Sequence, residues 1–94
     1  MAIGLLTLEL YLPGVSSLKE KRSRIKPLIH RLHREFNVSV AEMDNHDVWQ
    51  NATLVCALIS NDSAHTQRAL QNVQRWVEEN WPDLTLVDDQ IELL

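Results

Sequence analysis

The sequence predicts an α+β fold, because strand-like and helix-like patterns follow one another in the order β-α-β-β-α-β. Two segments with helical periodicity each connect two strand patterns, and a cluster of turn-forming residues separates the second strand from the third. This order is typical of the ferredoxin-like class, in which four antiparallel strands form one sheet and both helices cover one of its faces. Residues 1–94 are expected to form a single domain of this class.

The first strand is predicted over Ala2–Leu12. Leucine occupies every second position in the latter part of this segment, a period of two that indicates a strand with one buried face. The alternating leucines are Leu6, Leu8, Leu10 and Leu12. Pro13-Gly14 is expected to end the strand and to start a short loop.

The first helix is predicted over Ser17–Phe36. Ser17 and Glu20 have the S-x-x-E spacing of a capping box, and apolar residues then recur at helical spacing along one stripe. The stripe consists of Leu18, Ile25, Leu28, Ile29, Leu32 and Phe36. Pro27 has no N–H group, so we expect one helix with a kink near Ser23–Lys26.

A hairpin is predicted after the first helix. Its strands cover Val38–Met43, which contains polar residues and suits a half-exposed position, and Ala52–Ser60, which is apolar on both faces. Residues 44–47 are expected to form the turn between them.

The last two predicted elements are a helix and a strand. The second helix begins at one of the capping residues 61–63 and ends at Trp81-Pro82. The fourth strand covers Leu84–Leu94, with a bend or bulge expected at Asp88-Asp89.

The expected topology leaves one face of the sheet without helices. Right-handed crossovers place the first and third strands in the centre and the second and fourth at the edges. The open face would then carry Ile3, Leu5, Thr7, Glu9, Val55, Ala57 and Ile59. Because an apolar patch of this extent is often buried by a partner, we expect a homodimer formed through this face or through the edge of the second strand.

Charge is distributed unevenly along the chain. Residues 17–34 have a net charge of +6 and residues 42–94 of −8, within a total of −4. The first helix therefore concentrates the positive charge, which indicates a candidate nucleic-acid-binding surface. Its candidate site residues are Lys19, Lys21, Arg22, Arg24, Lys26, Arg31 and Arg34. Lys21 and Arg22 flank the apolar stripe, and their charges are expected in water.

No catalytic signature is present, so we expect a binding protein without a cofactor and not an enzyme. A glycine-rich phosphate loop is absent, since Gly4 and Gly14 are the only glycines. Acylphosphatases share this fold class but use a basic, glycine-containing loop after the first strand, and residues 12–16 contain no arginine. Cys56 lies among apolar residues in the middle of a strand, which indicates a core residue and not a nucleophile.

Two further clusters have a functional and a structural interpretation. His30 and His33 could share a metal ion with Glu35 or Asp44, or could extend the basic face at low pH. Carboxylates around the hairpin turn could bind a cation or perform acid–base chemistry, or could form a hydrated turn. These carboxylates are Glu42, Asp44 and Asp47.

The three tryptophans are expected to differ. Trp76 lies on the apolar stripe of the second helix and is expected in the core, and Trp81 is expected to pack at its end. Trp49 follows the hairpin turn and is either an exposed interface anchor or a lid over the sheet edge.

Three segments in combination resemble the YlxP-like family of small bacterial proteins. They are Ser17-Leu-Lys-Glu-Lys-Arg22, Phe36-Asn-Val-Ser-Val-Ala-Glu42 and Trp49-Gln50. The resemblance covers the whole chain and implies a ferredoxin-like fold. Family members are often encoded beside translation factors and carry the label of probable ribosome-binding factors by that association. Pro27 departs from the first helix that the family implies.

Together these observations predict a small module that contacts structured RNA or the ribosome through the first helix. The alternative is a protein-binding or oligomerising domain that uses the open sheet face and has no role with nucleic acid. A cytoplasmic location is expected, because no long apolar stretch or secretory leader is visible and the single cysteine permits no internal disulfide.

Overall fold

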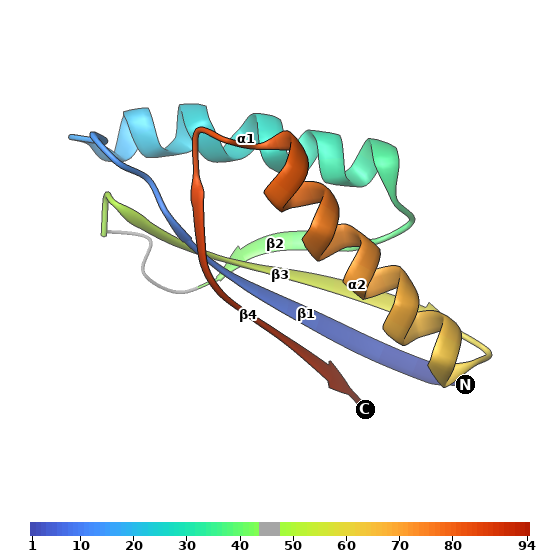
Figure 1. The fold of residues 1–94 in the computed structure, drawn as a ribbon. Helices are drawn as coiled ribbons and strands as arrows, with labels where there is room; N and C mark the ends of the chain where they lie inside the picture. The colour runs from blue at the N-terminus through green and yellow to red at the C-terminus, as the bar shows by residue number, and fades with distance from the viewer. Residues whose placement is uncertain (44–47) are drawn as a thin grey trace.

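The computed structural model describes residues 1–43 and 48–94 and confirms the predicted order of elements. The chain forms one sheet with two helices packed against it (Figure 1). The strand limits agree with the predicted ones to within one residue at each end. The elements are β1 (Ala2–Tyr11), α1 (Leu18–Glu35), β2 (Ser39–Met43), β3 (Asn51–Ser60), α2 (Ser63–Asn80) and β4 (Thr85–Leu93).

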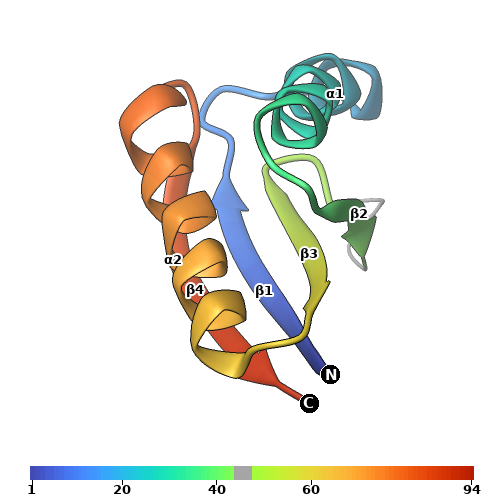
Figure 2. The same ribbon diagram turned by 90° about the vertical axis from the view of Figure 1, so that its right-hand side faces the viewer.

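The sheet has the strand order β2-β3-β1-β4, with every neighbouring pair antiparallel. β1 and β3 form the central pair over their full lengths, from Ala2 opposite Ser60 to Tyr11 opposite Asn51. The predicted central and edge positions are therefore correct. Both helices lie on the same side of this sheet (Figure 2).

The core lies between the sheet and the two helices. All four alternating leucines of the first strand pattern are buried, because the period of two turns them toward the helices. The helical stripes supply the opposite side of the core. Besides these leucines, the buried core includes Ile25, Leu28 and Leu32 of α1, Leu70, Val73 and Val77 of α2, and Leu54 and Cys56 of β3.

α2 packs closely on β1 because Gly4 has no side chain. A Cβ atom at this position would lie 2.6 Å from Thr66 Cγ2 and 2.7 Å from Leu70 Cδ1. The hydroxyls of Ser60 and Thr66 are hydrogen-bonded at 2.7 Å, which ties the end of β3 to the first turns of the helix. The Asp62 carboxylate caps the helix by accepting hydrogen bonds from the backbone N–H groups of Ala64 and His65.

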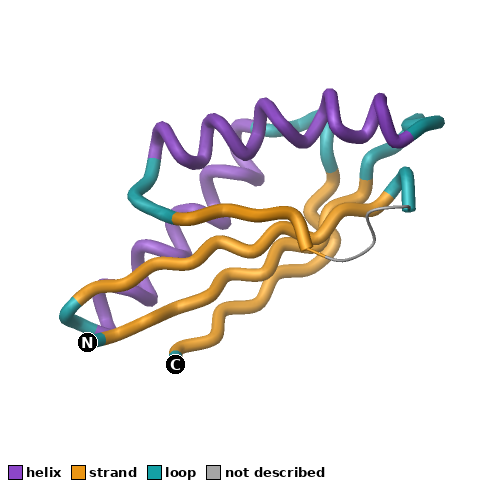
Figure 3. Tube along the Cα trace, turned by 180° about the vertical axis from the view of Figure 1, so that it is seen from behind, coloured by secondary structure: helices purple, strands orange, loops and turns teal. Residues whose placement is uncertain are grey.

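α1 is one continuous helix that contains Pro27 in its interior. Figure 3 shows the helix without a break. Pro27 faces solvent, so its ring does not disturb the buried stripe. Because proline has no N–H group, the carbonyl of Ser23 loses the hydrogen bond that position 27 would otherwise donate.

β4 contains a bulge. Asp88 pairs with Glu9, whereas the next paired residue is Leu86, which lies opposite Leu10. Val87 is thus the additional residue, and its side chain is 64% exposed. The irregularity predicted at Asp88-Asp89 is present one position earlier.

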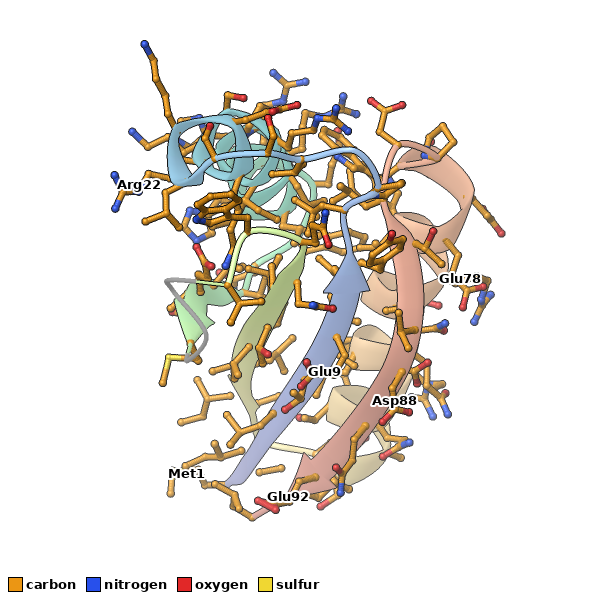
Figure 4. The ribbon with its side chains drawn as sticks, turned by 90° about the vertical axis from the view of Figure 1, so that its left-hand side faces the viewer. Met1, Glu9, Arg22, Glu78, Asp88 and Glu92 are labelled. Carbon is orange, nitrogen blue, oxygen red and sulfur yellow. The ribbon has the colours of Figure 1, made fainter. Side chains whose placement is uncertain are left out.

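The open face of the sheet carries the predicted residues. Ile3 lies opposite Ile59, Leu5 opposite Ala57, and Thr7 opposite Val55. Figure 4 views this face directly and shows Glu9 and Asp88 side by side on it.

Candidate nucleic-acid interface

The start of α1 is fixed by hydrogen bonds around Glu20. Ser17 Oγ accepts from the N–H of Glu20 at 3.1 Å, as the predicted capping box requires. The Glu20 carboxylate reaches one residue further back, to the N–H of Ser16 at 3.1 Å and its hydroxyl at 3.2 Å. These hydrogen bonds, together with the positive charge of Arg24, lower the pKa of Glu20.

Four cations form an exposed row along α1, which we call the cationic row: Lys19, Arg22, Lys26 and Arg34. At 100° per residue they lie within a sector of about 120°, and at 1.5 Å per residue the row is about 22 Å long. Within residues 1–43 and 48–94 none of the four makes an ion pair. Figure 4 shows Arg22 projecting from the helix into solvent. His30 and His33 occupy the same sector and are also exposed.

Arg24 and Arg31 flank the cationic row and are engaged in weak contacts. Arg24 Nη2 lies 3.4 Å from Glu20 Oε1, and Arg31 Nη2 lies 3.3 Å from Glu35 Oε1. The Arg31 guanidinium also lies 5.4 Å from the ring centroid of Trp76. Ion pairs this exposed contribute between 0 and about 1 kcal/mol, so an external phosphate can compete for both guanidinium groups.

Lys21 does not belong to the exposed surface, and the expectation that its charge lies in water is wrong. Its side chain is 2% exposed, and Nζ lies 2.9 Å from Glu42 Oε2. The same ammonium group donates to the backbone carbonyl of Val48 at 2.8 Å. Lys21 occupies the same side of the helix as Ile25 and Leu28, so its stem enters the core. Its charge joins α1 to β2 and to the segment that precedes β3.

His33 contacts the neighbouring strand β2. His33 Nε2 accepts a hydrogen bond from the N–H of Val40 at 3.2 Å, which ties the end of α1 to β2. In the part of the chain that is described, no three His, Cys, Asp or Glu side chains are grouped to hold a metal ion. Asp44 and Asp47, the remaining members of the predicted acidic cluster, lie outside the described residues.

The tryptophans are placed largely as predicted. Trp76 is half-buried against the core and makes an edge-to-face contact with Phe36, with ring centroids 5.8 Å apart. Trp81 packs beside it with a centroid separation of 6.1 Å. Trp49 is 48% exposed, and its role as an interface anchor stays a prediction.

A cleft of about 270 Å³ lies next to the cationic row, between α1 and the connection from α2 to β4. Its lining residues are Ser23, Arg24, Pro27, Trp81, Asp83 and Leu84. Nothing in the sequence indicates this site, because the two segments are far apart in the chain and no spacing pattern links them. Only the packing of both helices on one sheet brings them together.

Cys56 is fully buried among core residues, as predicted. Burial raises the pKa of its thiol to about 12, because the thiolate would be poorly solvated. The sulfur is therefore protonated at neutral pH and is not a nucleophile in the folded state.

The two helices of the described residues lack the combination of length and apolar character that a membrane span requires. α1 carries nine charged residues in eighteen positions.

Comparison with known proteins gives two matches. Residues 3–91 match the model of the family described as "Protein of unknown function (DUF503)". The chain is also similar to the "Uncharacterized protein YlxP" of Bacillus subtilis (strain 168), with 32% identity over 82 residues that cover 87% of this chain and 88% of the relative. The chain therefore belongs to the YlxP-like family of proteins of unknown function, DUF503.

Proposed function

We propose that this protein is a non-enzymatic, cytoplasmic RNA-binding module that contacts structured RNA, such as that of the ribosome, through α1. The observation that carries the proposal is the cationic row, four exposed cations without an ion-pair partner among the described residues. The separation of charge along the sequence supports it, because residues 17–34 have a net charge of +6 and residues 42–94 of −8.

Helix stability can account for Arg34, in the last turn of α1, but not for the N-terminal end of the cationic row. The N-terminus of an α-helix carries a partial positive charge, so a cation in the first turn is unfavourable by a few tenths of a kcal/mol. Lys19 is nevertheless in the first turn of α1, whereas α2 begins with the carboxylate of Asp62. Positive charge at the start of α1 is therefore better explained by an anionic partner.

The dimensions of the row suit a nucleic-acid backbone. A row of about 22 Å spans several successive phosphates, and each Lys or Arg that contacts one releases condensed counterions. A-form RNA is recognised mainly by its shape and its backbone, for which a helix with fixed positive charges and no base-reading motif is sufficient.

The test is RNA binding at several salt concentrations, with ribosomal RNA fragments as the probe. Replacing Lys19, Arg22, Lys26 and Arg34 by Gln should reduce affinity about 100-fold at 50 mM salt and lower the log–log salt slope by about three. The double variant Arg68→Gln/Arg75→Gln removes both cations of α2, half as many charges as the quadruple variant, and serves as a control that should bind like the wild type. Equal binding by the quadruple variant, with its thermal unfolding unchanged, would refute the proposed interface.

A second candidate function is homodimerisation through the open sheet face, and the arrangement of that face favours it. The apolar residues gather over β1 and β3, where Ile59 is 62% exposed, whereas β4 brings acidic side chains to the same face. Two copies could therefore pack through the apolar half and keep their acidic margins apart. Sedimentation equilibrium should then show a dimer that Ile59→Asp dissociates and that salt hardly affects, whereas a monomer at high micromolar concentration excludes this function.

A further inference from the structure

We propose that the cleft beside the cationic row receives one unpaired base of the bound RNA and prefers guanine; this inference rests on the proposed function. The cationic row alone contacts phosphates, which position a nucleic acid but carry no sequence information. The cleft supplies the complementary element, a recess in which a single base edge can be read.

The size and walls of the cleft suit one planar ring system. Its volume of about 270 Å³ is just below the range of about 300–1,000 Å³ that is usual for drug-sized ligands. The Pro27 ring and the half-buried indole of Trp81 line it, and Leu84 is the buried apolar residue among its lining groups. Unpaired RNA bases stack on aromatic side chains in this way, which contributes about 1–3 kcal/mol for each base.

The polar groups of the cleft favour guanine. Asp83 is exposed, and among the residues with described positions it forms no ion pair. A carboxylate can accept two parallel hydrogen bonds from the adjacent N1–H and N2–H groups of guanine, and no other standard base presents two neighbouring donors on that edge. Arg24, whose contact among the described residues is the 3.4 Å ion pair with Glu20, can donate to the O6 atom of the same base.

Pro27 also interrupts the hydrogen-bond ladder of α1 beside the cleft. The Ser23 carbonyl lacks the helical hydrogen bond from position 27, and both residues line the cleft. This interruption of the hydrogen-bond ladder therefore lies at the proposed site and not elsewhere along α1.

The cleft opens beside the cationic row. Ser23 is four residues after Lys19 and three before Lys26, and residues at these separations are neighbours on a helix surface. A strand whose phosphates follow the cationic row can thus place one extruded base between Pro27 and Trp81. A bulge or a loop provides such a base without the cost of breaking a pair.

The test compares three RNA hairpins that differ at one position: a single bulged guanosine, a bulged uridine, or no bulge. The wild type should bind the bulged-guanosine hairpin about tenfold more tightly than the other two. Asp83→Asn should reduce this preference to less than about twofold, with the salt slope and the affinity for the fully paired hairpin unchanged. Asp88→Asn, an exposed carboxylate on the open sheet face, is the matched control and should keep the preference.

The possible failures are distinguishable. Salt-dependent binding without a preference for guanosine, or a preference that survives in Asp83→Asn, overturns the base site and leaves the proposed function standing. The absence of salt-dependent binding to all three hairpins refutes both proposals. Trp81→Leu gives an independent check, since it should weaken binding of the bulged-guanosine hairpin severalfold relative to the fully paired one.

Discussion

The two helices of this protein meet the same structural requirement with very different surfaces. α1 and α2 each have 18 residues, and each buries one apolar stripe against the same face of the sheet. α1 carries seven Lys or Arg residues and two Glu, whereas α2 carries two Arg and two Glu. The difference lies almost entirely on the solvent side.

We infer from this difference that the exposed cations of α1, unlike the buried Lys21, are not needed for folding. α2 packs on the same sheet and presents to solvent a polar face whose charges sum to zero. The exposed cations of α1 raise repulsion within the helix and add nothing to the buried stripe. This difference supports the proposal that the cationic row serves a partner and not the stability of the domain.

The helices also differ in how they are attached to the sheet. α2 lies close to β1 at Gly4, where its side chains take the space that a Cβ atom would need. α1 is joined to the hairpin by polar contacts, through the ion pair of Lys21 with Glu42 and the hydrogen bond between His33 and Val40. Removal of the Lys21 ammonium group should therefore weaken the attachment of α1. A larger residue at Gly4 should weaken the packing of α2 on β1.

The largest effect on stability is expected at the buried anchor of α1. Lys21→Met should lower the free energy of unfolding by about 3 kcal/mol, because the Glu42 carboxylate and the Val48 carbonyl lose their shared donor. Lys19→Met, the same substitution at an exposed position of the same helix, should change it by less than about 0.5 kcal/mol. Urea denaturation followed by tryptophan fluorescence measures both, and equal values would show that the buried pair contributes nothing.

A smaller effect is expected where α2 meets β1. Gly4→Ala should destabilise the fold by about 2 kcal/mol, because the added methyl group overlaps Thr66 Cγ2 and Leu70 Cδ1. Thr66→Ser removes one of these atoms and keeps the hydroxyl that bonds Ser60, so it should restore part of the loss in the double variant. If the double variant is less stable than Gly4→Ala alone, the overlap is not the cause.

One charge reversal on each helix compares their roles in RNA binding. Lys26→Glu should weaken binding to a double-stranded RNA hairpin about tenfold at 50 mM salt, since it removes one phosphate contact and introduces repulsion. Arg68→Glu on α2 changes the net charge by the same amount and should have less than about a twofold effect. Filter binding measures both affinities. If RNA binding depends only on total charge, the two variants should be weakened equally, and that result would contradict a local interface on α1.

The smallest expected effect concerns the start of α1 and depends on pH. The pKa of Glu20 is lower in the folded protein than in the unfolded chain, so its contribution to stability is complete above the ordinary glutamate pKa of about 4.3. The contribution is lost as the pH falls through the lower folded-state pKa. Exchange of the Ser16 amide proton, measured from pH 6 to pH 3 and corrected for the intrinsic pH dependence of exchange, should show reduced protection over this range. Glu20→Gln should show no such change, and the same decrease in this variant would contradict the assignment.

Much of the fold could be predicted because its elements have strong local signals. The alternating leucines of β1, the stripe and capping residues of α1 and the apolar pattern of β3 each depend on neighbouring residues only. Connection rules were then sufficient to place β1 and β3 in the centre of the sheet.

The candidate site was predicted less completely, for a physical reason. Positive charge on α1 is visible in the sequence, but whether each charge meets water or protein depends on what packs against the helix. Lys21 and Arg22 are adjacent in the chain, yet one ammonium group is buried against Glu42 and the other cation is exposed.

The sequence by itself determined the order of the elements, the buried stripe of each helix and the concentration of cations on α1, because all of these follow from periodicity and composition. Only the tertiary structure decided which cations remain available to a partner and that a cleft opens beside them. Both depend on contacts between segments that are distant in the chain, and such contacts form only when the two helices share one face of the sheet.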